Sequence, residues 1–411
     1  MTALQDELER AMEDAPRVAA VQILAKQCEE TGVKLSAEQR EELYEHVRVD
    51  DDAIYLTGPL ILDGQRIELS LDEDDVAAIE ACMGALGDKM PRLLKRIGDR
   101  LGEDLLHKLR DAWPEQSRML DQDRHDFTRR LDERWGKPLS MLRMMLAVSR
   151  EFGEMTSSAI AVQGEGEALR RNVLTRLHAR SCQVCDEIAC LLTNGFADGA
   201  MARWRTLHEI SVVALFILER GEATAQRYLD HRHIETYQAA RSYREYSNRL
   251  GYVPMADEDF EAAKRARDKA AANYERSFTT RYGWAAAALD MKKPNLLNIE
   301  KSVGVDHLRP YYKLACLNVH AGSKGSVDRL GLLSGSDTLL AGPSNAGLSN
   351  PGQNAAISLY RSSVALGLLV PTLDSLVGLH VLSELANDIC QAFHAASEQL
   401  KEDAASGTAE E

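Results

Sequence analysis

The stretch EALRRNVLTRLHARSCQVCDEIACLLTNG, residues 167–195, decides the fold class. Its apolar residues recur with the spacing of one helix face, and the terminal pair Asn194–Gly195 is a typical left-handed helix cap. Two further helical stretches follow, at residues 198–220 and 222–250, and a glycine closes each of them. This pattern predicts an all-α protein whose centre is a multi-helix bundle.

The chain after residue 250 continues the helical pattern. We expect a fourth helix at 258–282, a short helix at 307–318 and a long helix pair over 355–400. Between them, residues 321–353 carry seven glycines and are expected to form a long loop. Loops of this length inside a compact domain are often functional.

The chain before residue 167 reads as a helical extension. Residues 1–50 predict two or three amphipathic helices, and Ser36 with Gln39 forms a capping-box pattern. Asp63–Gly64, between two apolar arms, predicts one small β-hairpin near residues 60–70. Residues 75–165 are charged and helical, with Pro114 and the WGKP at 135–138 as expected interruptions.

These differences in composition and pattern divide the chain into three regions. Residues 1–165 form the helical N-terminal region, which we interpret as a sensor or oligomerisation arm. Residues 166–395 form the bundle, and residues 396–411 are expected to be a disordered acidic tail. The glycine-containing QGEGE at 163–167 is the expected hinge.

Composition limits the partners. The chain has 411 residues, 45% of them hydrophobic, with a net charge of -15 and seven scattered cysteines. The charge disfavours nucleic acid and anionic membranes on average, so any RNA contact would need a local basic patch. An odd number of scattered cysteines, with no signal peptide or membrane span, predicts a soluble cytoplasmic protein of bacterial type. We expect no cofactor.

The segment EIACLLTNGFADGAMARWRTLHEISVVALFILERGEATAQRYLDHRHIETYQ (187–238) and the later YYKLACLNVHAGSKG (311–325) resemble a bacterial family, the "domain of unknown function 5677" group. The resemblance covers residues 167–395 and implies an all-helical fold. A more distant likeness is to the helical nucleotide-binding ribonucleases of bacterial defence, the "higher eukaryotes and prokaryotes nucleotide-binding" superfamily. It implies a metal-independent site in which a histidine acts on the ribose 2′-hydroxyl and an arginine four to six residues upstream holds the phosphate.

Spacing alone does not single out the site. Six of the eleven histidines have an arginine five to seven residues upstream. Arg203 and His208 have this spacing, but residues five apart lie about 140° apart on a regular helix. Position separates His208 from the other histidines, because it follows a glycine-bounded turn at the start of an apolar helix.

Two groups of residues are therefore candidates. We predict His208, His320 and Arg203 as catalytic residues, and as binding residues Arg205, Glu209, Asn318 and Lys324. The structural alternative is an ion pair between Arg205 and Glu209, helix packing by His208, and helix capping by Asn318 and His320.

Two histidine-rich stretches raise the question of a metal. His178, Cys182 and Cys185 share one helix face, and His231 and His233 lie near acidic residues. A zinc site usually takes ligand pairs from two elements, and no second pair is evident. We expect buried cysteines at the first stretch, a polar helix surface at the second, and no metal.

Two functions remain open. The first is an endoribonuclease-like protein of bacterial antiviral defence or stress response, with histidine as general base, arginine holding phosphate, and RNA as partner. The alternative is a non-catalytic helical protein-interaction module, with a partner protein or a homo-oligomer.

Overall fold

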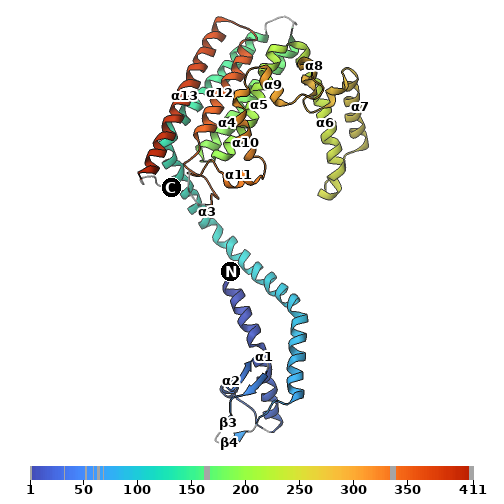
Figure 1. Cartoon of the computed structure of the whole chain (residues 1–411), viewed down its shortest axis with the longest axis vertical. Helices are drawn as coiled ribbons and strands as arrows, with labels where there is room; N and C mark the ends of the chain where they lie inside the picture. Colours follow the sequence, from blue (N-terminus) through green and yellow to red (C-terminus); the bar gives the residue numbers. More distant parts are fainter. Residues whose placement is uncertain are drawn as a thin grey trace. The chain divides into compact units, whose positions relative to one another are not determined.

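The structure, a computed structural model of the chain, describes residues 2–31, 33–50, 53–58, 60–62, 65–67, 69–161, 167–333 and 339–406. The chain divides into two units, Met1–Leu120 and Asp121–Glu411. Helix α3, Glu73–Ala161, contributes residues to both (Figure 1). The expectation of an all-α protein with a small hairpin is confirmed.

The first unit surrounds a small apolar core. Helices α1 (Thr2–Glu30) and α2 (Ala37–His46) contribute to it, together with the beginning of α3. Its fully or nearly fully buried members include Leu24, Cys28, Leu43, Val47 and Ile79. The capping box at the start of α2 is present, with Ser36 accepting from the Gln39 amide and the Gln39 side chain accepting from the Ser36 amide.

Two hairpins follow α2. The pair β3 (Leu60–Leu62) and β4 (Gln65–Ile67) is the predicted hairpin, and its turn, residues 63–64, lies outside the described residues. The pair β1 (Val47–Asp50) and β2 (Ala53–Leu56) was not expected, since helix was predicted up to residue 50. That prediction is wrong for β1, where buried Val47 lies opposite Leu56 and β-branched residues favour the strand.

The 89-residue helix α3 has no break at Pro114 or at residues 135–138, where interruptions were predicted. Packing explains the second case. Trp135 is fully buried, and its indole Nε1 donates to Asn345 Oδ1 at 2.9 Å. Leu131, Leu139 and Leu142 continue this buried face at helical spacing, so tertiary contacts hold the helix through Pro138.

The division between units therefore lies inside α3, whereas we expected one after residue 165. Residues 163–166 of the expected hinge lie outside the described residues.

The second unit is the helical bundle. Its longer helices are α4 (Ala168–Thr193), α5 (Ala197–Arg220), α6 (Glu222–Leu250), α7 (Asp257–Ala272), α12 (Ser349–Gly367) and α13 (Leu373–Ala405). Short elements connect α7 to α12: η1 (Arg276–Thr279), η2 (Gly283–Ala285), α8 (Ala286–Leu289), α9 (Leu296–Ser302), η3 (Asp306–Leu308), α10 (Arg309–Leu317) and α11 (Ser323–Val327).

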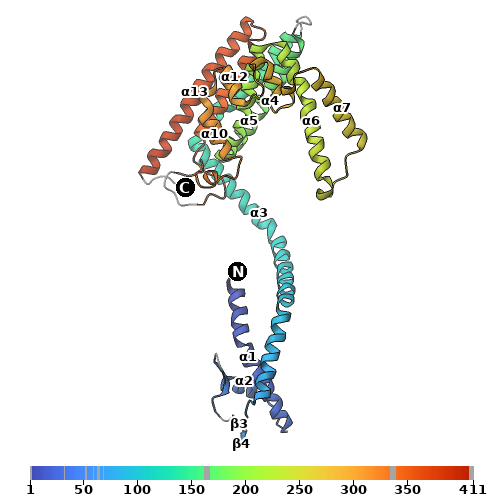
Figure 2. The ribbon, with the colours of Figure 1, turned by 45° about the vertical axis from the view of Figure 1, so that its right-hand side comes forward.

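Helices α4, α5 and α12 pack against one another at the centre of the bundle, and α13 packs on α12 at its edge (Figures 1 and 2). Small hydroxyl residues of α12 line its contact with α4 and α5. The Trp204 indole Nε1 donates to Ser358 Oγ at 3.0 Å, and Ser181 Oγ donates to Ser362 Oγ at 2.8 Å. These contacts satisfy buried polar groups while letting the helices pack closely.

Three expectations for this unit need correction. Helix α7 ends at Ala272 rather than 282, because the chain after it folds back so that the Gly283 and Trp284 carbonyls accept from Arg227. The expected loop at 321–353 contains α11 and the start of α12, and its residues 334–338 lie outside the described residues.

The third correction concerns the tail. Helix α13 continues through residues 396–405, which were expected to be disordered. Leu400 is buried there, and Arg134 pairs with Asp403 at 2.8 Å. Residues 407–411 lie outside the described residues.

Among the described helices, none combines the length and the apolar character that a membrane crossing requires.

Candidate functional site

Helix α5 carries four of the predicted site residues and begins after a turn that needs glycine. Gly195 has a φ of +75°, and a Cβ there would lie 2.6 Å from the Phe127 ring and 2.9 Å from the Ser344 carbonyl oxygen. The helix starts at Ala197, one residue before the expected position. Side chains of α5 then point to different neighbours, as helical geometry requires.

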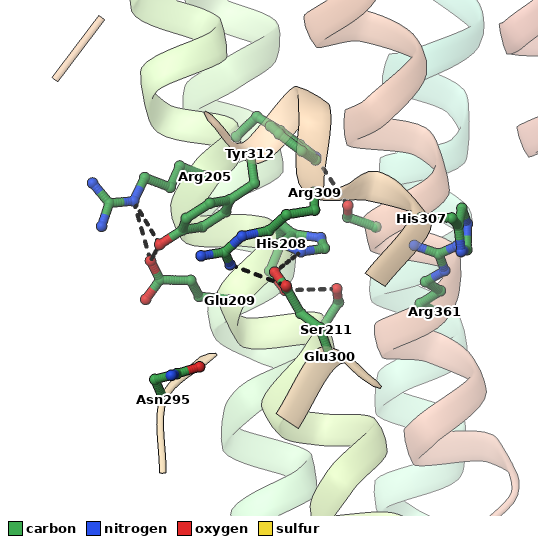
Figure 3. Close-up of polar contacts among 12 residues, drawn as sticks. Arg205, His208, Glu209, Ser211, Asn295, Glu300, His307, Arg309, Tyr312 and Arg361 are labelled. Carbon is green, nitrogen blue, oxygen red and sulfur yellow. Dashed lines mark hydrogen bonds and ion pairs between the residues drawn. The ribbon is translucent and has the colours of Figure 1, made fainter. Parts of the chain in front are cut away.

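His208 is completely buried and joined to a buried acid. Its Nε2 lies 3.0 Å from Oε1 of Glu300 on α9, and both side chains have 0% exposure. The other Glu300 oxygen, Oε2, accepts from Arg309 Nη1 at 3.0 Å (Figure 3). The three groups form a His–Glu–Arg contact in which His208 and Glu300 are fully buried and the Arg309 side chain is 28% exposed. We call this contact the buried triad: His208, Glu300 and Arg309.

A second contact lies one helical turn away on the same helices. The Arg205 Nε donates to the Tyr312 hydroxyl at 2.9 Å and to Glu209 Oε1 at 3.2 Å, and the Tyr312 hydroxyl donates to Glu209 at 2.6 Å. Burial, the hydrogen bond to Glu209 and its negative charge together raise the pKa of Tyr312 above its ordinary value. Tyr312 is therefore a neutral donor at physiological pH.

Aromatic rings fill the space between the two contacts. The His208 ring centroid lies 5.2 Å from that of Trp204 and 5.8 Å from that of Tyr312, and the Arg309 guanidinium lies 4.6 Å from the Tyr312 centroid. Within the described part of the chain, His208 Nδ1 has no hydrogen-bond partner. Each acid of the cluster has a cationic partner: Glu300 pairs with Arg309, and Glu209 pairs with Arg205. The contacts of these charged groups join α5 to α9 and α10.

Arg203 faces another element. It pairs with Glu187 of α4, and its Nη1 lies 3.4 Å from Thr206 Oγ1. The structure therefore places Arg203 toward α4, while His208 contacts α9 and α10, in agreement with their angular separation along α5. It does not assemble the predicted Arg203–His208 pair.

The other predicted residues lie after α10. Asn318 is the C-cap of this helix, and His320 is exposed two residues further on. Lys324 on α11 is exposed and pairs with Asp328 at 2.5 Å. Because His208 has no exposed surface and His320 is solvent-exposed, the two histidines do not share a solvent-accessible cleft.

Sequence reasoning found Arg205, His208 and Glu209 but missed three of their partners: Glu300, Arg309 and Tyr312. Tyr312 lies in residues 311–325, which carry the family resemblance, and this position could have pointed to it. Glu300 follows the apolar residues Leu296 and Ile299 in a short helix, and an acid within an apolar run indicates a buried partner.

The histidine–cysteine stretch of α4 contains a buried histidine beside a buried cysteine. His178 Nδ1 lies 4.0 Å from Cys182 Sγ beside a cavity of about 390 Å³ between α3 and α4. Burial lowers the pKa of His178 to about 4 and raises that of Cys182 to about 11. Both groups are neutral at pH 7, which is the opposite of a reactive thiolate–imidazolium pair.

His231 differs from the expected polar surface position. It is buried, its Nε2 donates to the Thr280 carbonyl at 2.9 Å, and its ring lies 5.4 Å from that of Phe278. Among the residues that the structure describes, no three His, Cys, Asp or Glu side chains are grouped to hold a metal ion.

The fold and the cluster define a helical-bundle protein in which a charge-balanced polar cluster joins α5 to α9 and α10. Residues 171–337 of the chain match the model of a family described as "Family of unknown function (DUF5677)". The match confirms the resemblance over this range, which is less than half of the chain and ends before α12. No curated protein and no solved structure matches the chain.

Proposed function

We propose that this chain is a non-catalytic helical module that binds an acidic segment of a partner protein. The observation that carries the proposal is the buried triad. A general base must reach its substrate, whereas His208 has 0% exposure and its Nε2 is engaged by Glu300. The polar residues of the site support a structural role, holding α9 and α10 against α5.

A separate surface supports partner binding. The end of α6 and the residues that follow it expose a cluster of apolar and aromatic side chains, which we call the α6 tip: Tyr243, Tyr246, Leu250, Tyr252 and Val253. Tyrosine is enriched at protein interfaces, because it supplies contact area with little loss of conformational entropy.

The charge of the α6 tip favours an acidic partner. Residues 239–253 contain Arg241, Arg244 and Arg249 but only one acid, Glu245. Arg244 pairs with Asp257 at 2.8 Å, while Arg241 and Arg249 are exposed. The exposed Arg241 and Arg249 beside the tyrosines can pair with an acidic segment that also offers apolar side chains.

Fluorescence anisotropy tests this proposal. The probes are a labelled 15-residue peptide of alternating glutamate and leucine, the same peptide with lysine in place of glutamate, and a 15-nucleotide poly(U). We expect the full chain to bind the acidic peptide in preference to the other two. The double variant Tyr246→Ala/Arg249→Glu should weaken this binding at least about tenfold.

The matched control is Lys292→Glu, which makes the same charge change at an exposed position outside the α6 tip. Equal loss of binding in the control would show a general charge effect and contradict the assignment. Preference for poly(U), or no binding of the acidic peptide, would also contradict it.

The ribonuclease function stays a prediction, and a separate assay tests it. The full chain is incubated with total RNA beside His208→Ala and His320→Ala variants. A non-catalytic module leaves the RNA intact in all three samples. Cleavage by the wild-type chain that is lost in either variant would overturn the proposed function and support the catalytic reading.

A further inference from the structure

The first unit exposes a long apolar stripe on α3. It runs over residues 94–120, about 40 Å of helix. Its members are 38% to 61% exposed: Leu94, Ile97, Leu101, Leu105, Leu106, Leu109, Trp113, Met119 and Leu120. Single exposed apolar residues are ordinary, but nine of them along one side of a helix mark an interaction surface.

The stripe occupies one side of the helix. At about 100° per residue, its members fall within half a turn, which also includes the longer polar side chains Lys95, Lys108 and Gln116. The opposite side carries charged or polar residues such as Arg96, Glu103, His107 and Arg110. A helix with this pattern packs its apolar side against another element. In the described part of the chain, the stripe residues remain exposed.

Two glycines lie on the same side. Gly98 and Gly102 lie within the stripe, and a Cβ built on either would meet nothing within 4 Å. Glycine in the middle of a helix costs about 1 kcal/mol relative to alanine. A shallow position of this kind allows the backbone of a second helix to approach closely.

The sizes of the stripe residues are complementary when two copies of α3 are aligned antiparallel. With residue 107 at the centre, residue 94 lies opposite 120, and Trp113 lies opposite Leu101, next to Gly98 and Gly102. The largest side chain of the stripe would therefore fill the shallow part of the other copy. In a parallel pair, tryptophan would meet tryptophan and glycine would meet glycine.

Charge favours the same direction. Residues 92–100 contain four cations and one anion, whereas residues 114–122 contain two anions and one cation. An antiparallel pair places these two stretches opposite each other. A parallel pair would place the cationic stretch against itself, which is repulsive.

We infer that a second copy of this chain covers the stripe, with the two α3 helices antiparallel over residues 94–120. This goes beyond the proposed function, since it concerns a different helix and a different partner. A monomeric chain would overturn it and leave the binding of acidic segments untouched.

Light scattering of the full chain in solution tests the association. We expect a dimer, with about twice the 45.6 kDa mass of one chain. The variant Leu101→Glu/Leu105→Glu should raise the dimer dissociation constant at least about a hundredfold, because it places four charges in the contact. The matched control, His107→Glu/Arg110→Glu, changes charge at two exposed positions on the opposite side of the same helix and should remain a dimer.

Circular dichroism of each variant verifies that helix content is retained. A monomeric wild-type chain overturns the inference. A dimer that survives Leu101→Glu/Leu105→Glu places the contact elsewhere and also overturns it.

Disulfide trapping tests the direction. In a background with the exposed Cys82 and Cys190 replaced by serine, one preparation carries Leu94→Cys and the other Leu120→Cys. An antiparallel pair forms the mixed disulfide when the two are combined. A parallel pair separates these positions by about 40 Å and instead links each variant to itself, which would overturn the antiparallel assignment.

Discussion

At the scale of single residues, the chain uses its buried polar groups to join helices. Glu300 accepts from two cationic or polar partners that come from different elements, His208 on α5 and Arg309 at the start of α10. A buried carboxylate is tolerated when its partners satisfy it, and removing one member leaves the remaining buried members unpaired.

Glu300→Ala should therefore be strongly destabilising. We expect a loss of about 3 kcal/mol in the free energy of unfolding, mainly from the cost of leaving the buried His208 without its acceptor and from loss of the Arg309 ion pair. Glu300→Gln should lose less, because its amide oxygen still accepts one hydrogen bond. Urea unfolding followed by tryptophan fluorescence reports mainly on this unit, because its Trp135, Trp204 and Trp284 are buried while Trp113 of the first unit is exposed.

Glu258→Ala, at an exposed position on α7, is the control and should change stability by less than about 0.5 kcal/mol. If Glu300→Ala changes the free energy of unfolding as little as this control does, the buried triad does not stabilise the bundle.

His178 predicts a pH dependence of stability. Its pKa falls to about 4 in the folded chain because of burial, against about 6.5 when unfolded. The unfolded chain therefore binds the proton more readily between these values, and stability is lost as the pH falls from 6.5 toward 4. Between pH 7 and pH 5 the loss from this residue should be about 2 kcal/mol.

The comparison with His178→Gln isolates this contribution, because glutamine does not titrate. Urea unfolding of both chains at pH 7 and pH 5 gives the difference. An equal pH dependence in the two chains would mean that His178 is accessible to protons in the folded state.

At the scale of elements, the sequence predicted those helix ends and turns that depend only on neighbouring residues. Helix α6 matches its predicted bounds because Gly221, which ends α5, and Gly251, which ends α6, both have positive φ values. The hairpin at β3–β4 was also evident in the sequence. Strand β1 and the end of α7 were not, because pairing with β2 and the contacts of Arg227 determine them.

In the candidate site, too, contacts between residues close in sequence were predicted and contacts between distant residues were not. The ion pair of Arg205 with Glu209 lies four residues apart on one helix, and sequence spacing predicts it. The partner of His208 is distant in the chain, so no local pattern assigns Glu300 to it. Continuity of α3 through Pro138 likewise depends on the burial of Trp135, which only tertiary packing reveals.

Close contact between α12 and α13 gives an element-scale prediction. A Cβ at Gly352 would lie 2.3 Å from the ring of Phe393, which is fully buried. Gly352→Ala should therefore lower stability by about 1–3 kcal/mol, because the ring has no space to move into. Thermal unfolding by circular dichroism measures the change.

Gly199→Ala is the matched control, since its Cβ would meet Leu191 at an ordinary 3.6 Å within helix α5. This substitution should be neutral or stabilising by up to about 1 kcal/mol, through helix propensity. Similar destabilisation by both substitutions would contradict the close packing of α12 on α13.

At the scale of the whole molecule, the two units have separate apolar cores. The core of the first unit draws its buried members from residues 20–79, and that of the second from residues 131–400. The buried triad belongs to the second unit, and the apolar stripe of α3 lies in the first. Stability and self-association should therefore be separable by cutting the chain.

A chain that begins at Asp121 tests this separation. It retains the larger core, so we expect it to fold with the helix content of that unit and to unfold at the same urea concentration as the tryptophan-monitored transition of the full chain. It lacks the stripe, so light scattering should show a monomer under conditions in which the full chain is a dimer. An unfolded fragment would mean that the second unit depends on the first. A folded fragment that still dimerises would place the self-association surface in the bundle rather than on α3.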